Sequence, residues 1–138
     1  MSSPGKPVRL RSSARTSTGQ VRENNEDNVH LWVQDDSVLA IVADGMGGAA
    51  AGEEASRLAV EAIQDGLVVA DQPVLKRFET LGDETIAQKM REIIRLANGD
   101  IMRRAASDPD LRGMGTTVTL AFVRNMHAIV AHVGDSRA

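Results

Sequence analysis

One stretch constrains the fold more than any other: the apolar run Val38 to Ala43, which leads directly into Asp44 and the glycine-rich segment 45–48. Six apolar residues in a row, bounded by glycines, predict a strand that is buried on both faces. Glycine allows backbone dihedrals that other residues avoid, and it lets a ligand approach main-chain atoms. A helical pattern opens just beyond, near Glu53-Glu54. The stretch therefore predicts a buried strand that presents a carboxylate beside a loop suited to a cation or a phosphate.

A plainer interpretation of the same residues is an ordinary turn. Asp followed by Gly is common after strands because both residues tolerate turn geometry. Glu53 and Glu54 also have a simple role, since acids near a helix N-terminus complement its dipole, and this is the role we favour for them. Other segments of the chain must therefore decide whether Asp44 is functional.

Composition excludes several kinds of site. With 138 residues, 42% of them hydrophobic, the chain is long enough for one domain with a core. It has no cysteine, which rules out disulfides, thiolate zinc sites and a cysteine nucleophile. Any metal must then be held by oxygen or imidazole ligands, which favours Mg or Mn. A net charge of -3 and only two Phe, one Trp and no Tyr argue against a nucleic-acid partner.

No segment is typical of membrane insertion or export. The apolar runs are far shorter than a membrane-spanning helix requires, and the N-terminus lacks the apolar core of a signal peptide. We therefore expect a cytoplasmic location and no membrane partner.

The first part of the chain predicts a tail followed by a hairpin. Residues 1–14 are rich in Ser, Pro and basic residues and indicate a flexible tail, or at most an edge strand near Val8 to Leu10. Residues 15–21 could form a strand that enters a turn at Gly19. Gln34 to Ser37 then separates an apolar strand, Val29 to Val33, from the central apolar run, so the two are expected to pair as an antiparallel hairpin.

Two amphipathic helices are expected next, separated by a loose stretch with Pro73. The second helix has Asp83 as a candidate N-cap and ends at Ser107 to Asp110. The apolar residues that recur at helical spacing are Ala55, Leu58, Ala59, Ala62, Ile63 and Leu67 in the first helix and Ile86, Met90, Ile93, Ile94, Ala97 and Ile101 in the second.

A second hairpin closes the pattern. Val118 to Val123 and Ala128 to Val133 are rich in β-formers and flank a turn at Asn125-Met126. The order is strands, two helices, strands, with no alternation of single strands and helices. This order favours an α+β fold in which helices pack on an antiparallel sheet.

Acids stand at three separate strand or loop ends: Glu26 with Asp27, Asp44, and Asp135. Several hard oxygen donors in a chain without cysteine are typical of a Mg or Mn site. Arg22 adds a planar fork that suits phosphate oxygens. Together they indicate metal-assisted phosphoryl chemistry. No lysine follows the glycine segment as a phosphate-binding P-loop requires, so the sequence does not favour that class.

Four motifs carry a specific resemblance. They are Arg22-x-x-Asn25-Glu26-Asp27, Asp44-Gly45-Met46-Gly47-Gly48, Gly113-Met114-Gly115-Thr116-Thr117 and Gly134-Asp135-Ser136-Arg137. In this order, they resemble the metal-dependent protein serine/threonine phosphatases of type 2C, in their bacterial form. The resemblance implies a four-layer α-β-β-α sandwich of antiparallel sheets flanked by helices. Residues 15–138 would form only the N-terminal half of that domain.

The resemblance also implies a metal centre. Asp44 matches the acid that bridges two Mg or Mn ions, and Gly45 matches the residue whose carbonyl serves the second ion. Glu26 matches the acid that binds that same ion. Asp135 matches an acid near the site that serves a third ion in bacterial relatives.

The remaining implied roles concern the substrate. Arg22 matches the phosphate-binding arginine, and Asp27 matches an acid that orients the attacking water. That water would attack phosphorus in line, with no phosphoenzyme intermediate. The implied substrates are proteins carrying phosphoserine or phosphothreonine, the products of serine/threonine kinases.

The sequence departs from the family pattern in two ways. Many bacterial relatives carry His where this chain has Ala49, and loss of a general acid lowers a proton-transfer step by about 10²- to 10⁴-fold. The family domain also continues beyond the Gly134 motif to two further metal-binding aspartates, which have no counterpart here. We therefore expect the isolated chain to be inactive, and to self-associate or pair with the missing half through open sheet edges.

Two other interpretations stay open at this point. The chain could be a pseudophosphatase or regulatory half-domain that binds a partner without catalysis, which Ala49 and the absent aspartates favour. It could also be a structural α+β fragment whose acids are only solvated loop residues. The second requires several loops to imitate motif positions together, and we consider it the weakest.

Overall fold

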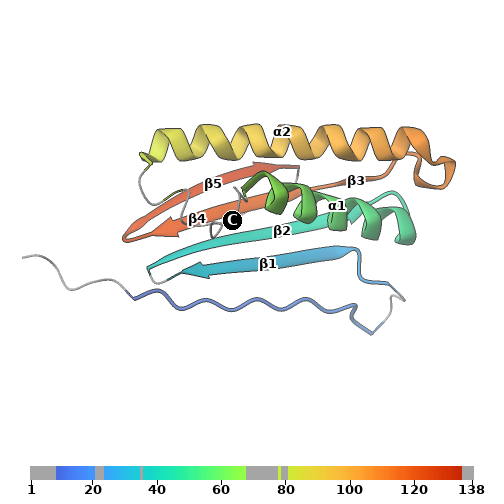
Figure 1. Cartoon of the computed structure of the whole chain (residues 1–138). Coiled ribbons are helices and arrows are strands. Elements are labelled where there is room, and N and C mark those ends of the chain that lie inside the picture. The colour runs from blue at the N-terminus through green and yellow to red at the C-terminus, as the bar shows by residue number, and fades with distance from the viewer. Residues whose placement is uncertain (1–8, 21–23, 35, 68–77, 79–80, 135–138) are drawn as a thin grey trace, which may run out of the picture.

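The computed structural model describes residues 9–20, 24–34, 36–67, 78 and 81–134. Figure 1 shows an antiparallel sheet with two long helices against it. The elements in chain order are β1 (Asp27–Gln34), β2 (Ser37–Met46), α1 (Ala49–Leu67), α2 (Asp83–Ser107), a 3-10 turn (Pro109–Leu111), β3 (Gly115–Thr116), β4 (Val118–Arg124) and β5 (His127–Val133).

The sheet confirms both predicted hairpins. Its strand order is β1-β2-β4-β5, all antiparallel, and the short β3 pairs with the end of β2. Leu39 lies between Trp32 on β1 and Phe122 on β4. At the β4–β5 turn, Asn125 has a φ of 52°, a left-handed conformation that asparagine tolerates better than most residues.

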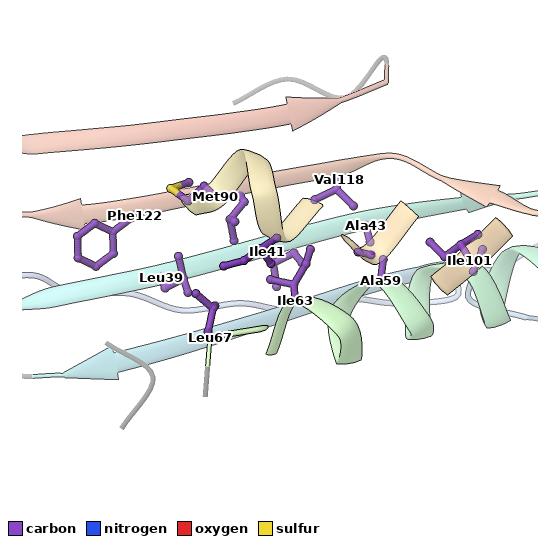
Figure 2. Packing of buried hydrophobic residues seen from close by; sticks show 14 of the residues in the cluster. Leu39, Ile41, Ala43, Ala59, Ile63, Leu67, Met90, Ile101, Val118 and Phe122 are labelled. Atoms are coloured by element: carbon purple, nitrogen blue, oxygen red, sulfur yellow. The ribbon is translucent and has the colours of Figure 1, made fainter. Parts of the chain in front are cut away.

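The core lies between the sheet and the helices. Leu39, Ile41 and Ala43 of β2 are fully buried, and Figure 2 shows them meeting residues of both helices and β4. Val42, on the opposite face, is 44% exposed. The prediction that this strand is buried on both faces was therefore wrong, because the helices cover only one face. The predicted apolar stripes of both helices are confirmed, although Leu58, Ala62 and Ile94 are only partly buried.

The helix ends differ in part from the expected ones. Helix α1 begins at Ala49, so Glu53 and Glu54 lie beyond its first turn, and their predicted role at the helix dipole was wrong. Glu54 instead accepts hydrogen bonds from Arg57, which lower the pKa of the Glu54 carboxyl. Its Oε1 atom also lies 3.7 Å from Nε of Arg104 in α2. The predicted N-cap Asp83 is the first residue of α2, and Gly82 is the cap.

The N-terminal part contributes no regular element among its described residues. Residues 9–18 form neither helix nor strand, so the edge strand suggested near Leu10 is absent there, and Val8 lies outside the described residues. The predicted turn is present at Gly19, where φ is 79°. Among the described residues, no helix is long and apolar enough to cross a membrane.

Arg124, at the end of β4, anchors the segment that leads into α2. Its guanidinium donates hydrogen bonds to the carbonyls of Phe78 at 2.9 Å and Leu81 at 2.7 Å. It also donates to the Asp83 carboxylate at 2.8 Å. The guanidinium carbon lies 5.9 Å from the centre of the Phe122 ring, within cation–π range. One planar fork thus ties β4 to the start of α2.

We expect Arg124→Lys to lower the free energy of unfolding by about 1–3 kcal/mol, because a lysine ammonium cannot reproduce the three-way fork. Urea denaturation of the purified chain measures this change. The control is Arg103→Lys, whose side chain is 73% exposed and pairs with Asp100 on the same helix. It should cost about 0.5 kcal/mol or less. Equal costs for the two variants would contradict the anchoring role.

Candidate metal and phosphate site

Two of the predicted acids face each other at one end of the sheet. Asp27 of β1 pairs directly with Asp44 of β2, so their side chains lie on the same face, and both are exposed. Carboxylates directly opposite in an antiparallel pair repel each other, which destabilises the pair unless a cation lies between them. The register itself therefore creates a place that favours a cation.

Glu26 lies at the same end but is turned toward the helices. Its carbonyl accepts a hydrogen bond from the amide of Gly45 at 3.0 Å. Its carboxylate packs against Gly52 of α1, where an added Cβ would lie 2.7 Å from Glu26 Oε2. Glu26 and Asp44 thus come from adjacent positions on neighbouring segments. The metal hypothesis requires their carboxylates to reach one ion, and this stays a prediction. Their carboxylates leave from opposite sides of the sheet edge.

The backbones of β2 and α1 meet where these acids gather. A Cβ on Gly45 would lie 1.9 Å from the carbonyl oxygen of Gly52, a distance that no side chain can occupy. Gly45 is accordingly buried. Because the crossing is so close, the glycines at both positions fix how near α1 comes to the end of β2, and with it to Glu26.

The glycine–threonine motif braces Asp44 from the other side. The amide of Thr117 donates to the carbonyl of Asp44 at 2.9 Å, and the amide of Asp44 donates to Thr117 Oγ1 at 3.2 Å. Gly47, with a φ of 111°, packs against the backbone of Met114. Sequence reasoning assigned no role to Thr117 or Gly52, although Thr117 lies in a motif that the resemblance had already singled out.

The described residues account for part of the predicted site. Glu26, Asp27, Asp44 and Gly45 lie at one end of the sheet. Arg22 and Asp135 lie outside the described residues. Within the described part of the chain, no group of three or more His, Asp or Glu side chains gathers closely enough to hold a metal ion. The donors present are carboxylates and main-chain carbonyls, the hard oxygen ligands that suit Mg or Mn, but they are an incomplete set.

Comparisons with known proteins agree on one family. The protein phosphatase 2C family profile matches residues 16–138. The serine/threonine phosphatase stp of Listeria monocytogenes is 36% identical over 129 residues, which are 93% of this chain and 48% of that protein. The serine/threonine protein phosphatase PstP of Mycobacterium tuberculosis is 38% identical over 128 residues, which are 93% of this chain and 22% of that protein.

Solved structures give the same result. The crystal structure of M. tuberculosis PstP matches with a TM-score of 0.72 and 37% identity, over 94% of this chain and 49% of that one. The PstP catalytic domain in complex with two manganese ions matches with a TM-score of 0.69 and 37% identity, over 91% of this chain and 48% of that one. The chain thus spans about half the length of these matched chains.

Fold and comparisons together define the class as a partial α+β domain with the fold of the bacterial serine/threonine phosphatases. The chain belongs to the protein phosphatase 2C family, as its motifs predicted.

We expect Gly45→Ala to destabilise the chain by at least about 1–3 kcal/mol, because its Cβ would force α1 away from β2. Thermal unfolding followed by circular dichroism measures the effect. Gly99→Ala is the matched control, since the nearest atoms to its added Cβ belong to the flexible end of Arg103. Alanine in that helix interior should be neutral or stabilising by up to about 1 kcal/mol. An unchanged midpoint for Gly45→Ala would contradict the close crossing.

Proposed function

We propose that the domain to which this chain contributes hydrolyses phosphoserine and phosphothreonine on proteins with the help of Mg or Mn ions. The observation that carries the proposal is the pairing of Asp27 with Asp44 beside Glu26 and Gly45, in a chain of the protein phosphatase 2C family. The manganese ions in the PstP structure support the choice of metal. The substrates would be products of serine/threonine kinases.

We assign the metal roles as the family resemblance implies them, beginning with the donors at the end of β2. Two ions would be held by Asp44, by Glu26 and by the Gly45 carbonyl. Asp135 would serve a third. When bound, these ions supply Lewis-acid polarisation of the phosphoryl group. The carboxylates of Asp27 and Asp44 lie on directly paired residues, and a bound cation would relieve their mutual repulsion.

The other two residues would act on the substrate and the water. Arg22 would hold the phosphate with two parallel N–H donors, which fixes the orientation of the phosphorus. Asp27 would accept a hydrogen bond from the attacking water and orient it for in-line displacement. Asp27 is exposed at the start of β1, where a water can reach it. Its amide donates to Asn25 Oδ1 at 3.0 Å, which holds the backbone at this position.

We expect the chain to bind Mn²⁺, and Asp44→Asn to weaken that binding by about 10-fold or more, because a neutral amide is a poorer ligand for a hard cation. Water-proton relaxation measures free and bound Mn²⁺ directly. Asp36→Asn is the control, since Asp36 is an exposed acid in the turn at the opposite end of β2. Identical affinities in both variants would place Mn²⁺ elsewhere and refute the metal site.

Activity is expected only in a completed domain. The 138-residue chain alone should release no phosphate from a phosphothreonine peptide in Mn²⁺, because it spans about half of each related domain. A fusion to the second half of the M. tuberculosis PstP catalytic domain should be active, and Asp44→Asn should abolish that activity. Activity of the isolated chain would contradict the first expectation. A folded but inactive fusion would contradict the second.

The face of the sheet opposite the helices is a candidate interface with a partner. Val33, Val42 and Val130 are 62%, 44% and 48% exposed, and the register and alternation of the strands place them on the face opposite the helices. Exposed apolar side chains gathered on one face of a sheet are typical of an interface. The occupant we propose is the segment that corresponds to the other half of the relatives. Self-association through the same face is the alternative outcome when that segment is absent.

Light scattering tests this expectation. The isolated chain should form dimers or larger species, and Val42→Lys with Val130→Lys should shift it toward the monomer without loss of helical circular dichroism. A monodisperse wild-type monomer would argue against an interface on this face.

Binding without catalysis is the second candidate function. Ala49, the first residue of α1, stands where many bacterial relatives have His, and this favours a domain that recognises a partner only. The fusion experiment separates the two candidates, because a binding module would retain Mn²⁺ and phosphopeptide affinity but release no phosphate.

A further inference from the structure

Thr117 fills a gap in the hydrogen bonding of β2. The ladder between β2 and β4 ends at the pair Val42–Thr119, and β3 pairs only with Gly45 and Met46. On one side, Asp44 pairs with Asp27 of β1. On the other side, it lies between the β2–β4 pairing and the β2–β3 pairing. Both of its main-chain polar groups are held by Thr117: its carbonyl by the Thr117 amide at 2.9 Å, and its amide by Thr117 Oγ1 at 3.2 Å.

The methyl group of the same side chain contacts the end of β5. A Cβ added to Gly134 would lie 2.6 Å from Thr117 Cγ2, so the backbone of Gly134 packs directly on this methyl. Gly134 has a φ of 103°, and the chain continues from it into Asp135. Thr117 is 2% exposed. One buried side chain thus contacts the ends of two strands from which predicted metal ligands come.

We infer that Thr117 is a positioning residue for the metal site: its hydroxyl fixes the backbone of Asp44 and hence the direction of that carboxylate. This inference rests on the proposed function. It goes beyond it because neither the motif resemblance nor the comparisons give this hydroxyl a role. The physical reason is that the Thr117 hydroxyl accepts from a partly buried amide, and losing that acceptor costs free energy, so Asp44 would shift to recover one. A ligand displaced in this way binds its ion less tightly.

The neighbouring Thr119 offers a matched comparison. It lies two residues further along the same strand segment and is 8% exposed, so both threonines are buried. Its hydroxyl, however, has no hydrogen-bond partner within the part of the chain that the structure describes. Valine has nearly the shape of threonine without the hydroxyl, so the same replacement at 117 and at 119 differs mainly in the bond to Asp44.

The experiment measures Mn²⁺ affinity of the 138-residue chain by water-proton relaxation, at a temperature where every variant is folded. Thr117→Val should weaken the affinity by about 10-fold. Thr117→Ser, which keeps the hydroxyl, should stay close to wild type, and Thr119→Val should leave the affinity unchanged. A purely structural role would lower the unfolding temperature of Thr117→Val and leave its affinity for Mn²⁺ intact, which would overturn the inference.

Hydrogen exchange of the Asp44 amide gives a second readout that needs no metal. The amide should exchange faster in Thr117→Val than in wild type, Thr117→Ser or Thr119→Val. Equal exchange in all four proteins would overturn the inference. If the wild-type chain binds no Mn²⁺ while the exchange differs as expected, the proposed metal site fails and the support of Asp44 by Thr117 stands. The two failures are therefore distinguishable.

Discussion

The contact on which the rest of the structure depends is the crossing of β2 and α1 at Gly45 and Gly52. Backbone touches backbone there, since an added Cβ on Gly45 would lie 1.9 Å from the Gly52 oxygen. The crossing sets where α1 begins relative to the end of β2, and it leaves room for the carboxylate of Glu26 against the helix. Because α1 also packs along β2 through Ala55, Ala59 and Ile63, the same geometry aligns the core and the acids.

The acidic end of the sheet is arranged by backbone contacts more than by side chains. Asp27 and Asp44 are brought together by strand register, and Glu26 by a main-chain hydrogen bond to Gly45. The hydroxyl of Thr117 then accepts a hydrogen bond from the amide of Asp44. Three short segments from different parts of the sequence are therefore fixed to one another by the protein's own contacts, which is the preorganisation that the proposed cation site would need.

Much of this fold could be predicted from the sequence, because it rests on local patterns. The hairpin turns and the apolar stripes of both helices follow from periodicity, and Ile86, Met90 and Ala97 are buried as expected. One-sided burial of β2 was missed because an apolar run cannot show which of its faces is covered. The roles of Arg124 and Thr117 were missed because each depends on partners 41 to 73 residues away, which no local pattern reveals.

The exposed sheet face around Val42 and Val130 has a consequence for how the chain folds. The helices and the helix-facing side of the sheet bury their shared core with partners that all lie within these 138 residues. The opposite face of the sheet stays exposed to water in this chain. If this core orders before a partner covers that face, the folding chain presents apolar surface on an ordered sheet, the kind of intermediate that chaperones protect from aggregation.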